Sequence, residues 1–217
     1  EPAVPAASAG VIASLQLPRS VEANVPTRLA YRLSDAKSGN AVTDVAITHD
    51  EPMHLIIVSR DLALFQHVHP QPTGRPGEYA VEVTFPRAGT YELYDEFSRS
   101  SGGDLLQASE VVVGTPSAEG ALLVEDRAPN VVDGLRVSLV GAGDLRAGQP
   151  AALTLRVENA TTGEPVRDLR PYLAAPAHVA ILSEDAKTFV HTHGEVPAPS
   201  GMGTMGQGPQ AAPASFG

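Results

Sequence analysis

One segment of sixteen residues occurs twice in this chain, and that repeat limits the possible folds more than any other feature of the sequence. Adding 124 to the residue numbers of 54–69 gives 178–193 without a gap. The identical pairs are His54 and His178, Ile57 and Ile181, Ser59 and Ser183, Asp61 and Asp185, Phe65 and Phe189, His67 and His191, and His69 and His193. Six of the seven histidines lie in these two copies. The repeat therefore predicts two modules that fold in the same way.

Each copy has the residue pattern of a β-hairpin. Residues 54–58 form a short apolar run rich in β-branched side chains, 59–61 favour a turn, and 65–69 alternate. In a hairpin folded about Arg60 and Asp61, opposed residues have numbers that sum to about 121 to 123, which sets His54 across from His67 or His69. Side chains two residues apart share a face, and opposed Cβ atoms lie roughly 4.5–5.5 Å apart. Three imidazoles therefore converge in each hairpin.

Converging imidazoles indicate a metal site in each copy. We predict one site from His54, His67 and His69 and a second from the equivalent residues, His178, His191 and His193. A His-x-His pattern alone often marks only a polar strand face, and shared descent of the repeat would preserve a structural histidine as well. Structural or solvent-facing histidines thus stay open as an alternative. His49 has no counterpart, since Leu173 takes its place, and we expect it at the surface with an accessory role in the first site left open.

The available ligands favour copper over zinc. The chain has no cysteine, which leaves His, Met, Asp and Glu. Imidazole suits zinc, copper and nickel, whereas thioether sulfur selects Cu(I). All three methionines, Met53, Met202 and Met205, lie near the histidine clusters, and we predict them as additional ligands. The alternative for Met53 is a place in the hydrophobic core, and the alternative for the Gly-rich stretch that holds Met202 and Met205 is disorder.

The net charge and the composition limit the classes of binding partner that we expect. The formal net charge of −10 disfavours nucleic acid and anionic lipid and mildly favours cations. No apolar run approaches the ~18 residues of a membrane helix. The expected partners are a metal ion and a copper-transport or efflux protein.

The strand pattern predicts an all-β fold. Short alternating segments at 11–17, 27–33, 78–85 and 105–113 are separated by turn signals, and no convincing helical period occurs. We predict antiparallel β-sandwiches of the immunoglobulin type. Residues 87–94 resemble the tyrosine corner of such sandwiches, in which a tyrosine bonds back to the backbone. The alternative is a tyrosine that merely alternates into the core.

The repeat sets the expected boundaries. Residues 1–10 form a flexible N-terminal tether, 11–114 the first module, 115–130 a linker and 131–217 the second module. Counterparts of residues 87–114 are missing from the second module, so we expect it to be truncated, or its sheet to be completed by a neighbouring segment. The Ala/Pro-rich start is typical of the segment after a removed signal peptide or lipid anchor, which favours an exported protein.

Catalysis is not expected. Ser59 and Asp61 recur with the histidines, but they occupy the turn, far from His67 and His69, which argues against a Ser-His-Asp triad. A three-His site with an open position can activate water on zinc. No general base or substrate pocket accompanies it in the sequence, so a zinc hydrolase is the least favoured hypothesis.

Residues 52–61 and 65–70, which read PMHLIIVSRD and FQHVHP, resemble secreted bacterial β-sandwich modules described as heavy-metal-binding or YtkA-like and often associated with copper export. The resemblance covers both modules. It implies an immunoglobulin-like fold in the periplasm or outside the cell and a metal-handling role for the six repeated histidines. We expect a metal buffer or delivery partner. The alternative is a tandem structural or adhesion module whose histidines serve only the fold.

Overall fold

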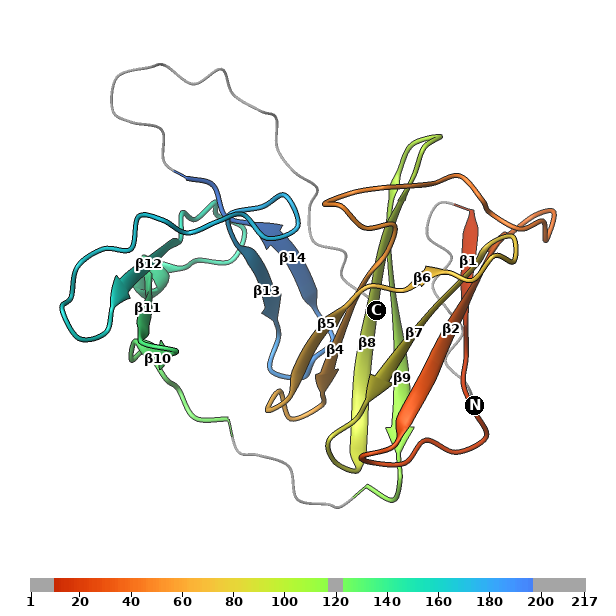
Figure 1. The fold of residues 1–217 in the computed structure, drawn as a ribbon, viewed down its shortest axis with the longest axis horizontal. Helices are drawn as coiled ribbons and strands as arrows, with labels where there is room; N and C mark the ends of the chain where they lie inside the picture. Colours follow the sequence, from red (N-terminus) through yellow and green to blue (C-terminus); the bar gives the residue numbers. More distant parts are fainter. Residues whose placement is uncertain (1–9, 117–122, 197–217) are drawn as a thin grey trace. The chain divides into compact units, whose positions relative to one another are not determined.

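The computed structural model describes residues 10–116 and 123–196, and within them the chain is all-β (Figure 1). The described ranges contain no α-helix, only a short 3-10 turn at Ala142–Asp144. They therefore hold no helix that could cross a membrane. These residues form two compact units. Unit 1 contains the described residues up to Leu123 and also Ala180–Val190, whereas unit 2 contains Val124–Val179 and the described residues from His191 onward.

Unit 1 has two antiparallel sheets. The first runs in the order β1 (Val11–Gln16), β2 (Pro26–Asp35), β7 (Glu78–Thr84) and β6 (Gln71–Pro72). In the second sheet, β8 (Gly89–Arg99) is the central strand and pairs with β3 (Val45–Ala46), β4 (His54–Ser59) and β9 (Asp104–Val113), while β5 (Phe65–Val68) pairs with β4. The strands lie where alternation predicted them, which confirms the all-β class.

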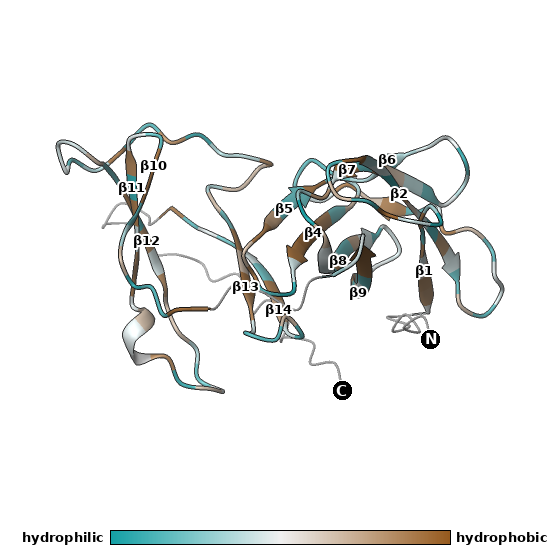
Figure 2. Cartoon of the chain, turned by 90° about the horizontal axis from the view of Figure 1, so that it is seen from below, coloured by the Kyte–Doolittle hydropathy of each residue, from teal (hydrophilic) through white to brown (hydrophobic). Residues whose placement is uncertain are grey.

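Both sheets of unit 1 contribute to one hydrophobic core. Leu29 and Tyr31 of β2, Leu55 and Ile57 of β4 and Leu93 of β8 are fully buried in it. β4 is largely hydrophobic, whereas β2 and β8 carry both hydrophobic and hydrophilic residues (Figure 2). Successive residues of a strand point to opposite faces of the sheet. The residues that alternate with Leu55 and Ile57 along β4, which include His54, therefore point away from this core.

The tyrosine predicted to bond back to the backbone is Tyr91. Its ring is buried against Phe85, and its hydroxyl donates a hydrogen bond to the Arg87 carbonyl at 2.9 Å. Both interpretations of this segment hold, because Tyr91 fills the core and also ties the start of β8 to the preceding turn.

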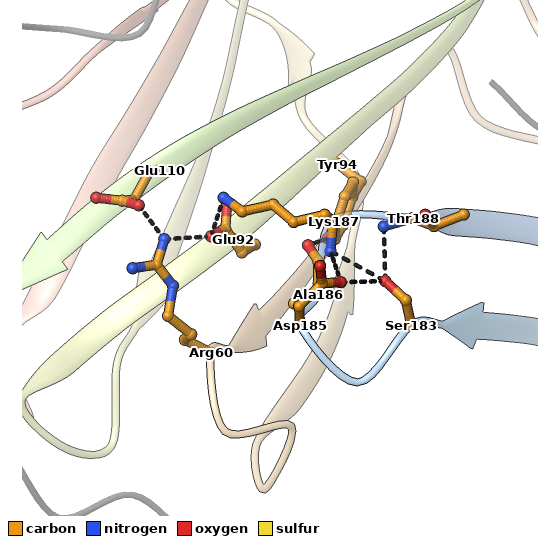
Figure 3. Close-up of polar contacts among 9 residues, drawn as sticks. All are labelled: Arg60, Glu92, Tyr94, Glu110, Ser183, Asp185, Ala186, Lys187 and Thr188. Atoms are coloured by element: carbon orange, nitrogen blue, oxygen red, sulfur yellow. Dashed lines mark hydrogen bonds and ion pairs between the residues drawn. The ribbon is translucent and has the colours of Figure 1, made fainter. Parts of the chain in front are cut away.

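The outer face of the β4–β8–β9 sheet carries a second, smaller cluster of apolar residues. Ile56, Val58 and Tyr94 are buried there together with Ala186 and Phe189 from the tip of the repeated hairpin, all within unit 1. The Tyr94 hydroxyl donates to the Ala186 carbonyl, as Figure 3 shows.

Charged side chains line the same outer face beyond this cluster. Glu92 is 5% exposed, and its carboxylate pairs with Arg60 at 2.7 Å and with Lys187 at 3.4 Å. Arg60 also pairs with Glu110 (Figure 3).

Unit 2 contains a three-stranded antiparallel sheet of β10 (Asn130–Val132), β11 (Leu135–Val140) and β12 (Thr154–Asn159). The repeated hairpin consists of β13 (His178–Leu182) and β14 (Phe189–His193), and its strands run from unit 2 into the part assigned to unit 1.

The backbone keeps the offset of 124 residues outside the hairpins as well. Gly10 and Gly134 have φ of 78° and 77°, and Gly39 and Gly163 have φ of 71° and 74°. These values lie in the left-handed region that glycine adopts without strain. The burial differs between the copies, however. Leu153 is 37% exposed in unit 2, whereas its counterpart Leu29 is fully buried in unit 1.

Candidate metal centre

The first histidine cluster is built by the register of the β4–β5 hairpin. Ile56 lies opposite His67 and Leu55 opposite Val68, so opposed residue numbers sum to 123. His54, two residues before Ile56, and His69, two residues after His67, therefore share one face of the hairpin. The ligand atoms of the three histidines all lie within 4.8 Å of one another. The predicted convergence is confirmed.

The ring positions suit a single ion. The ring centroids of His54, His67 and His69 are 5.5, 4.9 and 4.7 Å apart. Imidazoles bound to one ion through bonds of roughly 2.0–2.1 Å hold their centroids about 4.5–6.5 Å apart. His54 is 4% exposed and the other two are partly buried, which limits the competition from water.

A backbone carbonyl fixes the tautomer of His54. Its Nε2 lies 3.0 Å from the Thr48 carbonyl oxygen, and a carbonyl can only accept, so Nε2 carries the hydrogen. The other ring nitrogen, Nδ1, then presents its lone pair to His67 Nε2 at 3.2 Å. Nitrogens that share a tetrahedral ion lie roughly 3.3 Å apart. A histidine held this way through its outer nitrogen is the usual arrangement of a metal ligand.

That carbonyl belongs to a tight turn with unusual backbone angles. Thr48 and Glu51 exchange both backbone hydrogen bonds, at 2.9 and 3.2 Å. The two residues between them, His49 and Asp50, have φ of 50° and 67°. Left-handed φ at both central positions defines a type I′ turn, which here aims the Thr48 carbonyl at His54.

The second cluster repeats this arrangement. His178 Nε2 lies 2.9 Å from the Tyr172 carbonyl, and His178 Nδ1 lies 3.4 Å from His191 Nε2. The centroids of His178, His191 and His193 are 5.6, 4.7 and 4.8 Å apart. The carbonyl again comes from a turn with two left-handed residues, Leu173 at φ 47° and Ala174 at φ 57°. Ligand set, tautomer and supporting turn thus all recur.

Glu96 is a site residue that sequence reasoning missed. It lies directly opposite His54 across the β4–β8 ladder, on the same face of the sheet. A carboxylate there adds negative charge beside the first cluster, which favours a cation. No local pattern could have indicated it, because the register between β4 and β8 is set by contacts distant in sequence.

The neighbouring residue, Asp95, points the other way, into the core of unit 1. It is 0% exposed, and burial raises its pKa to about 8, with the Tyr31 hydroxyl opposing that rise in part. Neither Asp95 oxygen forms a hydrogen bond with another described group. Asp95 is a buried acid on the core side of the sheet that carries the first histidine cluster.

The remaining predicted residues lie elsewhere. Met53 is fully buried in the core of unit 1, which is the alternative place considered for it. Met202 and Met205 lie outside the described residues. Ser59 donates to Asp61 at 2.6 Å within the hairpin turn, and Asp61 also pairs with Arg87. These two residues stabilise the turn, in agreement with the argument against a catalytic triad.

Comparisons with known proteins give a family and a distant structural likeness. A search of solved structures finds superoxide reductase (neelaredoxin) from Ignicoccus hospitalis at 14% identity and a TM-score of 0.32, covering 50% of this chain and 87% of that one. A score this low supports no conclusion about fold or function. No curated protein matches the sequence. A family model described as a domain of unknown function (DUF8832) matches residues 6–114 and 130–214. Since these ranges cover most of the chain and include both histidine clusters, the protein belongs to this family.

Proposed function

We propose that the protein is an exported copper-binding protein that holds one ion at each of its two histidine clusters and acts as a metal buffer or delivery partner. The observation that carries the proposal is the oriented pair of imidazoles in each copy. In both, a backbone carbonyl accepts from Nε2 of the first histidine and leaves Nδ1 facing the second at 3.2 or 3.4 Å. Histidines that only form a solvent-exposed polar face would not need a backbone carbonyl to orient their rings.

The donor set supports copper, with zinc as the alternative. Three imidazoles suit either ion. The preference for copper rests on the resemblance to copper-associated secreted modules and on Met202 and Met205, which follow the second cluster in the sequence. The same resemblance supports a periplasmic or extracellular location.

An immunoglobulin-like architecture in two tandem modules belongs to the same proposal. The Tyr91 bond to Arg87 supports it in unit 1, and the repeated glycine turns support it in unit 2. A non-catalytic role is also part of the proposal. In support of it, Ser59 bonds to Asp61 and Ser183 to Asp185 within the hairpin turns.

Calorimetric titration of the full chain, purified without a His tag, tests the proposal with Cu(II) and with Cu(I) under reductant. We expect about two sites. His67→Ala should remove one, and His191→Ala the other. Gln66→Ala and Thr192→Ala are matched controls, since each neighbours a histidine in sequence but lies on the opposite strand face, and both should leave the stoichiometry at two.

The competing function is a structural or adhesion module with structural histidines. It predicts no binding of copper or zinc above background and a weaker fold when the histidines are replaced. If the variant with both His67→Ala and His191→Ala still binds two ions, the assignment of the site is wrong.

A further inference from the structure

The two hairpins that carry the histidine clusters are held in different ways. In the first, β4 lies between β5 and β8 and pairs with both. In the second, β13 and β14 form a sheet of only two strands within the part of the chain that the structure describes. A two-stranded hairpin is marginally stable by itself. The second cluster therefore needs support from outside its own hairpin.

The tip of the second hairpin provides that support. Ala186 and Phe189 are 1% exposed and pack, within unit 1, against Tyr94 on the outer face of the sheet. The Phe189 ring stacks on the Tyr94 ring with 4.5 Å between the centroids, and the Tyr94 hydroxyl donates to the Ala186 carbonyl (Figure 3). Ala180 and Leu182 of β13 pack against the same cluster. Both strands of the hairpin thus contribute to the contact.

The hairpin face that makes this contact also carries the metal ligands. Side chains two residues apart on a strand share a face, so Phe189 shares a face with His191, and Ala180 shares a face with His178. The imidazoles converge only while the two strands are paired, because His178 belongs to one strand and His191 and His193 belong to the other. A contact that fixes the tip through both strands keeps them paired.

We propose that Tyr94 and Phe189 are positioning residues for the second metal site, because the contact between their rings holds the β13–β14 hairpin in the conformation that binds the ion. The inference rests on the proposed metal-binding function. When only a fraction of the protein is in the binding-competent conformation, the affinity falls in proportion to that fraction. The first site has no such dependence, since the counterpart of Phe189 is Phe65, which is 53% exposed, and β8 supports that hairpin instead.

Matched variants of the two hairpins test this inference in the full chain. His191→Ala leaves the first cluster as the working site (the first-site chain), and His67→Ala leaves the second (the second-site chain). Phe189→Ala is made in both chains. Phe65→Ala, at the same position of the repeat, is the control in the first-site chain. Phe189→Leu keeps a buried apolar side chain and is the conservative variant.

The probe is Cu(II), and chelator competition measures its affinity. In the second-site chain, Phe189→Ala should weaken binding at least about tenfold, as a tenfold smaller competent fraction does. Phe189→Leu should restore most of the affinity. In the first-site chain, Phe189→Ala and Phe65→Ala should each change the affinity by less than about threefold, as substitutions that leave a site's support intact do.

Bound metal should also stabilise the tip, because coupling between two sites acts in both directions. The amide of Ser183 donates to the Thr188 carbonyl at 3.0 Å, and the amide of Ala186 donates to the Ser183 carbonyl at 2.9 Å. Hydrogen exchange at these two amides therefore reports on the tip. Cu(II) should slow their exchange in the second-site chain and leave it unchanged in the first-site chain.

Equal Cu(II) affinity of the second-site chain with and without Phe189→Ala would overturn the inference while leaving metal binding intact. An equal loss of affinity in both chains would overturn it as well, because it would show a general loss of structure rather than positioning of one site. Absence of Cu(II) binding in the parent and in both single-site chains would instead overturn the proposed function. Only this last result removes the signal from the parent protein.

Discussion

The ring of Tyr94 stacks on the ring of Phe189, with centroids 4.5 Å apart and planes 12° from parallel. Phe189 is 1% exposed, whereas its repeat counterpart Phe65 is 53% exposed. The same residue in the same hairpin position thus packs into a hydrophobic cluster in one copy and faces solvent in the other. The Tyr94 hydroxyl adds a hydrogen bond to the Ala186 carbonyl at the tip of that hairpin.

Phe189→Ala should therefore destabilise unit 1 by about 3–5 kcal/mol, the usual cost of removing a buried phenylalanine. Phe65→Ala is the matched control and should cost less than about 1 kcal/mol, in keeping with its exposure. Urea denaturation of both variants measures the free energy of unfolding. Equal losses in the two variants would contradict the assigned packing of Phe189.

The acidic residue Glu92 leads to a second prediction. Arg60 and Lys187 both reach this nearly buried carboxylate, at 2.7 and 3.4 Å, but both cations are about half exposed. Removing the closer one by Arg60→Met leaves Glu92 with a weaker partner and should cost more stability than Lys187→Met. Lys187→Met should cost less than about 1 kcal/mol, as exposed pairs do. Thermal unfolding at low and high salt measures the stability of both variants. A larger loss for Lys187→Met than for Arg60→Met would show that Lys187 is the main partner of Glu92.

Asp95 predicts an unusual pH dependence of stability. Its pKa is about 8 in the folded chain, whereas an unfolded aspartate titrates near ~3.9. Between these values the folded state retains a proton that the unfolded state has lost. The contribution of Asp95 to stability is thus fully present below pH ~4 and is lost as pH rises toward 8. The free energy of unfolding falls by at most about 1.4 kcal/mol per pH unit in this range.

Asp95→Asn should remove this slope and raise the stability at neutral pH relative to the parent. Glu82→Gln, an exposed carboxylate on β7, serves as the control and should keep the slope. The measurement is urea denaturation at intervals from pH 5 to 8. Parallel pH profiles for the parent and Asp95→Asn would mean that Asp95 ionises normally in the fold.

Acid should release metal from both clusters. An imidazole must be neutral to bind a metal, and the side chain ordinarily titrates near pH ~6.5, so protons compete with the ion. We expect bound Cu(II) to leave as pH falls from roughly 6 to 5, as equilibrium dialysis against buffers of decreasing pH would show. Copper retained in full at pH 5 would exclude a site made only of histidines.

Cu(I) affinity at neutral and mildly acidic pH tests the methionines. Thioethers do not titrate, so a site that uses Met202 or Met205 should keep part of its affinity for Cu(I) in acid. The variant Met202→Leu with Met205→Leu should then lose that residual affinity. Identical pH profiles for the parent and the variant would remove both methionines from the ligand set.

The first histidine cluster could be predicted because it depends on local structure. The register of a short hairpin follows from its turn, so the convergence of His54, His67 and His69 was set by residues within a sixteen-residue segment. The repeat then extended the same prediction to the second copy. The strands of unit 1 could be predicted for a similar reason. Apolar residues at every second position of a strand, such as Leu29 and Tyr31, are the ones that are buried.

Two of the features that were missed depend on contacts distant in sequence, and a third depends on a backbone group. Glu96 reaches His54 only through the pairing of β4 with β8. The contact of Tyr94 with Phe189 joins residues 95 positions apart. The Thr48 carbonyl is a backbone group, and no side-chain pattern marks it as the partner of His54. Local periodicity contains no information on any of these.

The orientation of His54 by a main-chain carbonyl has a consequence for how such sites evolve. Every amino acid carries that carbonyl, so no substitution at position 48 that preserves the turn deletes the partner of His54 Nε2. The side chain at position 49 is then open to change, as histidine in one copy and leucine in the other illustrate. A duplicated hairpin of this design can change the side chains of its supporting turn one residue at a time without losing the orientation of its first ligand.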